Sequence, residues 1–189
     1  MVPYNLLKKW SVESNDGGPK MNSNDQQKIA DITKKYRHKA LYRGTVVSES
    51  DFKKGQVEYK IPRLQSWTTN KSTAEGYATN FWANNANKRY KAGKPKVVFV
   101  ATNTSTRKVK SYILNDPAFA NRDAEVIVNR PVFTAYFNEA NYDYKKKVHY
   151  VPVEFIKSHT NRIVPNTTKQ CPVGMFQYAK QCVNRLIFG

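Results

Sequence analysis

The sequence predicts an α+β fold in which a mixed, mostly antiparallel β-sheet core, arranged as two packed sheets, carries a few helices. Strand-like segments, about seven or eight of them, follow one another in runs instead of alternating strictly with helices. The chain has 189 residues, 40% of them hydrophobic, and 12 Tyr, 9 Phe and 3 Trp supply core material. This length suits one well-filled core, whereas two full domains would be a stretch.

The first half of the chain begins with a polar segment over residues 1–25, which contains the breaker cluster Asn15–Pro19 and is expected to form an N-terminal arm or a short helix plus a loop. Asp25 is expected to cap a helix over about 26–39, because apolar side chains recur there at helical spacing. The elements expected next are strands at 40–47, 57–61 and 64–68, with a turn at 51–55.

The second half begins with a helix over about 73–84, for which Asn70 or Ser72 supplies the cap. A basic, Asn-rich loop follows, and residues 96–101, K-V-V-F-V-A, form the clearest buried strand. The remaining expected strands lie at 111–114, 124–128, 132–137 and 149–155.

The strands and helices that carry the predicted chemistry lie within residues 26–156, and residues 157–189 are predicted to be a basic C-terminal appendage. No acidic residue follows Glu154. Cys171 and Cys182 lie in this appendage and would close a local disulfide in an oxidising compartment or stay as thiols in a reducing one. With no second Cys or His pair nearby, we expect no metal site.

The charge is strongly positive, with 32 Lys and Arg against 14 Asp and Glu, a net charge of +18. Solubility alone needs a net charge of roughly 2–8. A field of this size attracts polyanions, so we expect a nucleic acid or a nucleic-acid-bound protein as partner, with a merely solvated surface as the alternative.

The hydropathy pattern predicts no membrane partner, because no apolar run approaches the roughly 18 residues of a membrane helix. The start of the chain lacks the apolar stretch of about 7–15 residues found in secretory signals. We therefore expect a cytoplasmic location, in the producing cell or in a target cell. Removal of a leader would instead make the protein a secreted toxin.

Three short segments in fixed order carry the candidate chemistry: Leu41–Gly44 (L-Y-R-G), Ser66–Thr69 (S-W-T-T) and Asp123–Val128 (D-A-E-V-I-V). No phosphate-binding glycine loop, H-E-x-x-H motif or G-x-S-x-G motif occurs in the chain. The three histidines give poor support for a Ser-His-Asp or Cys-His arrangement.

The three segments resemble the motifs of the arginine–serine–glutamate class of NAD-dependent mono-ADP-ribosyltransferases, which includes bacterial toxins and phage enzymes that modify host proteins. In that class an arginine ends the first core strand, a hydroxyl-rich strand end precedes a helix, and an [EQ]-x-E motif enters an apolar strand. The resemblance covers about residues 40–155. It implies that the chain cleaves NAD as a substrate, without a metal, and transfers ADP-ribose to a macromolecule.

The resemblance assigns a role to each motif residue. Arg43, with its planar fork of donors, would bind the pyrophosphate of NAD, next to Gly44. Ser66 and Thr68 would fix the geometry of the cofactor and of the catalytic glutamate. Glu125 would stabilise the positive charge that develops on the ribose as nicotinamide leaves. Aromatic residues that would pack on the nicotinamide are Tyr77, Phe81 and Trp82.

Asp123 stands where this class has Glu or Gln, at the position that helps select and activate the acceptor. Aspartate is acidic but about 1.5 Å shorter in reach than glutamate. The residues before it, 115–122, would form the target-recognition turn, with Phe119 as an aromatic that stacks on a base or packs on a protein. The identity of the acceptor is therefore left open by the motif.

Each motif also has an ordinary structural interpretation. Arg43 could pair with Glu49 or Asp51, Ser66 and Thr68 could be plain strand-end residues, and Glu125 could be an edge-strand acid. Two further functions stay open beside ADP-ribosylation of a nucleic acid or of a transcription or translation protein. One is a protein-arginine ADP-ribosyltransferase acting as a toxin or effector, and the other is a non-catalytic nucleic-acid-binding module.

Overall fold

The structure, a computed structural model, describes residues 4–15, 21–79, 93–114 and 124–156 of the chain. Within these ranges the helices are α1 (Tyr4–Asn15), α2 (Ser23–Ile32), α3 (Glu49–Lys53), α4 (Lys71–Thr79), α5 (Asn103–Thr106) and the 3-10 turn η1 (Phe137–Glu139). The strands are β1 (Ala40–Val46), β2 (Gln56–Lys60), β3 (Gln65–Thr68), β4 (Lys96–Thr102), β5 (Ser111–Ile113), β6 (Glu125–Val128), β7 (Val132–Tyr136), β8 (Asn141–Asp143) and β9 (Val148–Ile156).

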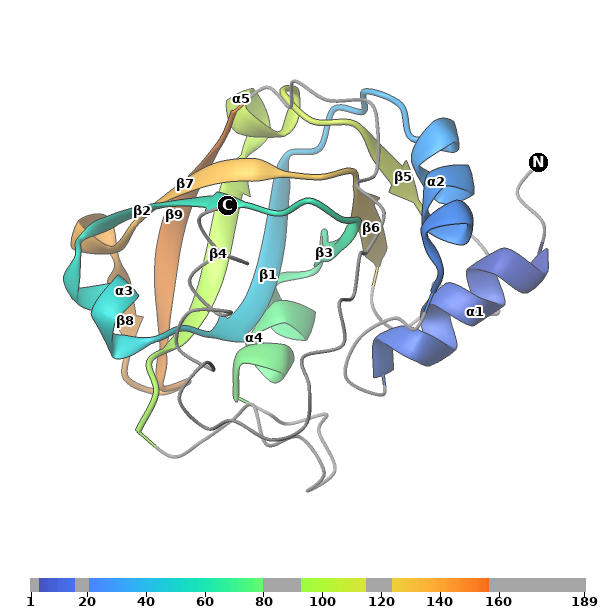
Figure 1. Cartoon of the computed structure of the whole chain (residues 1–189). Coiled ribbons are helices and arrows are strands. Elements are labelled where there is room, and N and C mark those ends of the chain that lie inside the picture. The colour runs from blue at the N-terminus through green and yellow to red at the C-terminus, as the bar shows by residue number, and fades with distance from the viewer. Residues whose placement is uncertain (1–3, 16–20, 80–92, 115–123, 157–189) are drawn as a thin grey trace, which may run out of the picture.

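The strands form one sheet in the order β2-β7-β9-β4-β1-β3-β6-β5, with β8 paired to β9 (Figure 1). Only β4 and β9 run parallel, and every other pairing in the described chain is antiparallel. The predicted α+β class with a mixed, mostly antiparallel sheet is therefore confirmed.

The two layers that we expected as separate sheets are two parts of this one sheet. They are joined between β1 and β3, where the register holds the single pair Tyr42–Thr68, whereas β1 and β4 pair along seven positions. The sheet bends at this weak junction, and the β3–β6 part packs on the β7–β9 part. The indole of Trp67 on β3 lies 5.0 Å from the ring of Phe155 and 5.7 Å from that of Phe133, centroid to centroid.

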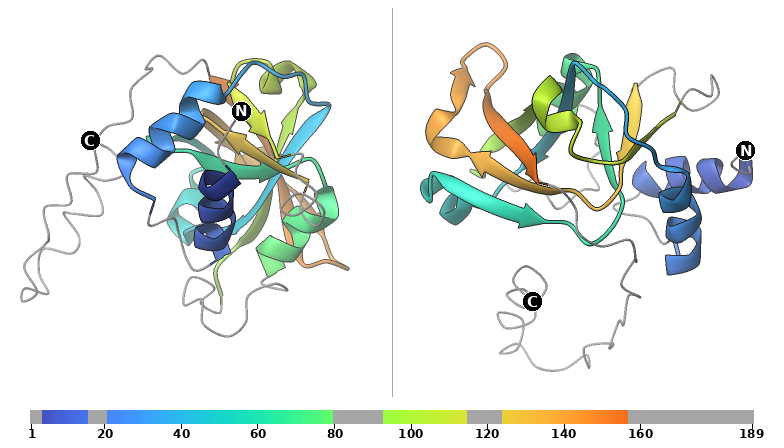
Figure 2. Two further views of the ribbon diagram at one scale, coloured as in Figure 1. Left: turned by 90° about the vertical axis from the view of Figure 1, so that its right-hand side faces the viewer. Right: turned by 90° about the horizontal axis from the view of Figure 1, so that it is seen from above.

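Helices α1 and α2 lie together against the end of the sheet formed by β5 and β6 (Figure 2). The apolar side chains of α1, Leu6, Leu7 and Trp10, form one buried cluster with Ile29 of α2 and Ile127 of β6. A salt bridge of 2.7 Å from Lys9 to Asp25 also connects the two helices. The N-terminal segment, for which a short helix is one of the two expectations, thus contributes helix α1 to a buried cluster.

Helix α2 differs from the predicted helix over 26–39 at both ends. It begins at Ser23 because Asn22, and not Asp25, supplies the cap: the Asn22 side chain accepts a hydrogen bond from the backbone N–H of Asp25 at 2.8 Å. It ends at Ile32 because the chain then pairs with β5, where Lys34 and Ser111 exchange two backbone hydrogen bonds of 2.9 and 2.8 Å. Residues after Ile32, which helical spacing alone assigns to the helix, therefore lie outside it, and Lys34 pairs with β5 instead.

Candidate active site

The three motifs lie on three strands that are neighbours in the sheet, β1, β3 and β6. Tyr42 of β1 pairs with Thr68 of β3, and Thr68 pairs with Glu125 of β6. Arg43 follows Tyr42 directly and Ser66 lies two residues before Thr68, so Arg43, Ser66 and Glu125 lie within two residues of this paired row. Segments that are distant in the sequence are thereby brought to one place, at the bend of the sheet.

Arg43 bridges the junction at which β1 and β3 part. Its Nη1 donates a hydrogen bond to the backbone carbonyl oxygen of Ser66. A charged donor makes such a bond stronger than a neutral one, and it holds the guanidinium beside β3. The two acids of the ordinary interpretation of this arginine, Glu49 and Asp51, each form an ion pair with a lysine. Glu49 pairs with Lys53 at 3.5 Å and Asp51 pairs with Lys54 at 3.2 Å.

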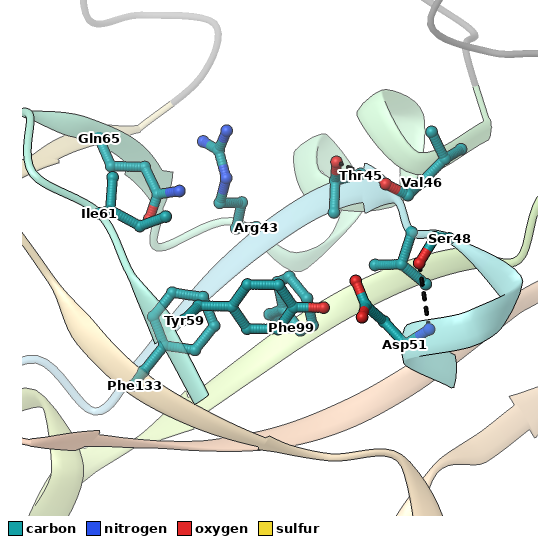
Figure 3. A pocket seen from close by; sticks show the side chains of 11 residues that line it. Arg43, Thr45, Val46, Ser48, Asp51, Tyr59, Ile61, Gln65, Phe99 and Phe133 are labelled. Carbon is teal, nitrogen blue, oxygen red and sulfur yellow. Dashed lines mark hydrogen bonds between the residues drawn. The ribbon is translucent and has the colours of Figure 1, made fainter. Parts of the chain in front are cut away.

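A cavity of about 240 Å³ adjoins Arg43. The rings of Tyr59, Phe99 and Phe133 form its aromatic wall, and the Arg43 side chain extends away from these rings, beside Gln65 (Figure 3). Pockets that hold a whole small-molecule ligand span roughly 300–1,000 Å³, so this cavity is smaller than such a pocket.

Tyr59 is the ionisable member of the aromatic wall, and its hydroxyl lies near the carboxylate of Asp51 (Figure 3). Burial, with the nearby charge of Asp51, raises the pKa of Tyr59 well above its ordinary value. The phenol is therefore neutral at physiological pH, and the cavity wall carries no phenolate that would repel a phosphate.

Glu125 opens strand β6 and is buried, with 8% of its surface exposed. The residue before it, Ala124, has φ 44°, a left-handed conformation that costs a non-glycine residue roughly 1–2 kcal/mol. The carbonyl oxygen of Ala124 accepts a hydrogen bond of 3.1 Å from the backbone N–H of Thr69. The strained turn and this bond set the register that places Glu125 opposite Thr68.

Glu125 has a partner that sequence reasoning missed. The indole Nε1–H of Trp10, on α1, donates to Glu125 Oε1 at 2.9 Å, and this bond is buried. Nothing in the sequence pairs two residues that lie 115 positions apart. The structure explains the contact, because Trp10 is buried and a buried indole needs an acceptor for its N–H.

Ser66 and Thr68 lie on the same face of the sheet as Glu125, because Ser66 pairs with Ile127 and Thr68 with Glu125, and alternate residues share a face. The Thr68 hydroxyl accepts a hydrogen bond of 2.9 Å from the backbone N–H of Asn70. Asn70 in turn accepts from the backbone N–H of Ser72 at 3.0 Å, at the start of α4. The hydroxyl motif thus connects β3 to the helix that follows it.

Two other residues are predicted to contact NAD. Gly44 lies on β1 against helix α4, and Tyr77 lies on α4 itself. The structure gives Gly44 a packing role, because a Cβ at this position would lie 1.7 Å from the carbonyl oxygen of Ala74. Tyr77 is on α4 with 37% of its surface exposed. Their contact with NAD stays a prediction.

Four predicted residues lie outside the described ranges: Phe81, Trp82, Phe119 and Asp123. Their roles also stay predictions. Within the described ranges, no group of three or more His, Cys, Asp or Glu side chains could hold a metal ion. In the same residues, no helix has both the length and the apolar character needed to cross a membrane.

No known protein-family profile and no curated protein matches the chain. Among solved structures, the chain is similar to the ADP-ribosyltransferase Vis in complex with M6 inhibitor, with 19% identity over 71% of this chain and 58% of that one and a TM-score of 0.49. It is also similar to Vis toxin, an ADP-ribosyltransferase from Vibrio splendidus, with 16% identity over 84% and 76% of the two chains and a TM-score of 0.49. The C3 exoenzyme of Clostridium limosum shares 11% identity over 70% and 67%, with a TM-score of 0.41. The chain thus spans less than two thirds of the length of the first of these structures.

Proposed function

We propose that this chain is an NAD-dependent mono-ADP-ribosyltransferase, with Arg43, Ser66 and Glu125 as its central residues. The observation that supports this most is the adjacency of β1, β3 and β6, since each strand carries one of the three motifs. Neighbouring strands thus carry an arginine, a hydroxyl-bearing strand end and a buried carboxylate, and Arg43 contacts the Ser66 backbone. This set has the chemistry that cleavage of an anionic nucleotide at a sugar carbon requires.

In the proposed reaction the glycosidic bond between the ribose and nicotinamide breaks, and its electron pair leaves with nicotinamide. The acceptor nucleophile then bonds to the same ribose carbon and releases its proton. Arg43 would hold the pyrophosphate by charge-assisted hydrogen bonds. Glu125, as a carboxylate, would bind the ribose and stabilise the positive charge that builds up in the transition state.

For the acceptor, we propose a nucleic acid or a protein that is bound to nucleic acid. The net charge of +18 supports this choice, because it would concentrate polyanions near the enzyme and speed their encounter. A protein arginine is the second acceptor to test, because Asp123 keeps an acid at the position that the resemblance links to acceptor choice.

The test is incubation of the protein with cell lysate and NAD labelled in its adenylate part, followed by digestion with RNase, DNase or protease in separate samples. The proposal predicts macromolecular label that a nuclease removes, or label on a protein that copurifies with nucleic acid. Label on a protein that is free of nucleic acid would support transferase activity but overturn the proposed acceptor. Absence of both label and nicotinamide release, with nucleic-acid binding retained, would identify a non-catalytic binding module.

A further inference from the structure

The carboxylate of Glu125 is held by a residue outside the three motifs. Trp10 is 3% exposed and Glu125 is 8% exposed, and the indole N–H donates to the carboxylate at 2.9 Å. A charged group taken this far out of water needs hydrogen-bond donors that compensate for its lost hydration. Trp10 supplies one such donor, and it comes from the N-terminal helix.

Both ends of this hydrogen bond are fixed by packing. On the α1 side, Leu6 and Leu7 lie in the same buried cluster as Trp10, and Lys9 pairs with Asp25 of α2. On the β6 side, Ile127 shares the face of Glu125 and belongs to that cluster too. Helix α1 therefore covers the face of β6 from which Glu125 projects.

The chemistry of the donor suits a carboxylate that must stay ionised and in one orientation. An indole N–H only donates, so it cannot take a proton from a substrate or compete with Glu125 for one. A hydrogen bond donated to a carboxylate stabilises its charged form. A ring buried among apolar side chains also has little freedom to turn, which keeps Oε1 in place.

We propose that Trp10 is a positioning residue for the reaction: its indole N–H fixes the rotamer of Glu125, so that helix α1 is part of the active site. This inference rests on the proposed function of Glu125. It gives the N-terminal helix a role in positioning the catalytic glutamate, although this helix lies outside the three motifs.

The test is the substitution Trp10→Phe, which keeps an aromatic ring in the cluster and removes the N–H. We expect kcat for nicotinamide release to fall about 10-fold, with the KM for NAD changed less than about twofold, because one hydrogen bond to the reacting carboxylate is lost and Arg43 still binds NAD. The matched control is Ile29→Val, which removes one methyl group from the same cluster and leaves the hydrogen bond intact. Its melting temperature should fall, while its kcat should equal that of wild type.

A double-mutant cycle measures the contact itself. In a Glu125→Ala background the acceptor is already gone, so Trp10→Phe should lower the melting temperature by less than it does in the wild-type chain. Equal shifts in both backgrounds would overturn the inference. An unchanged kcat in Trp10→Phe, or an Ile29→Val variant that loses kcat equally, would overturn it as well.

The same set of variants separates this inference from the proposed function. If Glu125→Gln keeps full nicotinamide release, the proposed function fails and takes the role of Trp10 with it. If Glu125→Gln loses release and Trp10→Phe keeps it, only the role of Trp10 fails.

Discussion

Gly44 of β1 and Ala74 of α4 meet backbone to backbone. A Cβ built on Gly44 would lie 1.7 Å from the carbonyl oxygen of Ala74 and 2.6 Å from the backbone nitrogen of Ala78. The glycine of the L-Y-R-G segment is therefore needed for α4 to lie directly on β1, next to Arg43. The packing of this helix also sets the position of Tyr77.

We predict that Gly44→Ala destabilises the protein by about 3 kcal/mol, because the added Cβ would meet helix backbone, which cannot rotate away as a side chain can. Urea unfolding followed by circular dichroism measures this loss. The matched control is Gly93→Ala, where the added Cβ has open space and only the positive φ of 91° is strained, at a cost of about 1 kcal/mol. Equal losses in the two variants would show that α4 can move away from β1.

Glu75 of α4 connects the helix to β9 and to the turn that precedes it. Its carboxylate accepts a hydrogen bond from Lys146 and one of 2.5 Å from the Tyr150 hydroxyl. Burial by itself would raise the pKa of Glu75, but the hydrogen bonds from Lys146 and Tyr150 and the charges of Lys146 and Lys71 outweigh it and hold the pKa below the ordinary 4.5. A pKa that is lower in the folded than in the unfolded state gives stability above the unfolded value, and this stability is lost as the pH falls through the folded value.

We therefore predict that Glu75→Gln lowers the free energy of unfolding by about 1 kcal/mol at neutral pH and makes no difference at a pH well below 4.5. Thermal melts from pH 7 to pH 3 measure the difference between variant and wild type. Glu49→Gln is the control, since the pair of Glu49 and Lys53 is exposed and worth little. A Glu75→Gln penalty that stays constant with pH would contradict the role of the charge.

Arg43→Lys should lower kcat/KM for nicotinamide release by about 10- to 100-fold, because lysine keeps the charge and loses the planar fork. The bond to the Ser66 carbonyl needs one donor, so the fold should tolerate the change better than the activity does. Arg107→Lys, an exposed residue at the end of α5, is the control. An Arg43→Lys enzyme with wild-type kcat/KM would show that pyrophosphate binding does not depend on this arginine.

Local patterns in the sequence predict the strands well because apolar and β-branched runs such as 96–101 suit a buried sheet wherever they lie. The three motifs likewise lie on strands or at their ends, as expected. Strand β8 was not predicted, since Asn141–Asp143 is short and mostly exposed and gains its pairing only from β9. The end of α2 was misplaced for the related reason that pairing of Lys34 with Ser111 overrides helical spacing.

The part of the candidate site that could not be predicted is the part that depends on tertiary contact. A motif search finds Glu125, but no local pattern connects it to Trp10, since the bond exists only once α1 packs on β6. The same holds for Gly44. A Cβ has no room there because helix α4, which begins 27 residues later at Lys71, packs on it. The sequence therefore predicts the candidate site residues, whereas the contacts that position them depend on tertiary packing.

The most direct test of the account is the rate of nicotinamide release from NAD by Glu125→Gln, compared with wild type and with Glu139→Gln, an exposed glutamate on the 3-10 turn η1. Glutamine keeps the shape and an acceptor for the Trp10 indole but cannot carry the negative charge that stabilises the ribose in the transition state. We predict a loss of about 100-fold or more for Glu125→Gln, and wild-type rates for Glu139→Gln. A Glu125→Gln protein that releases nicotinamide as fast as wild type would contradict the central claim.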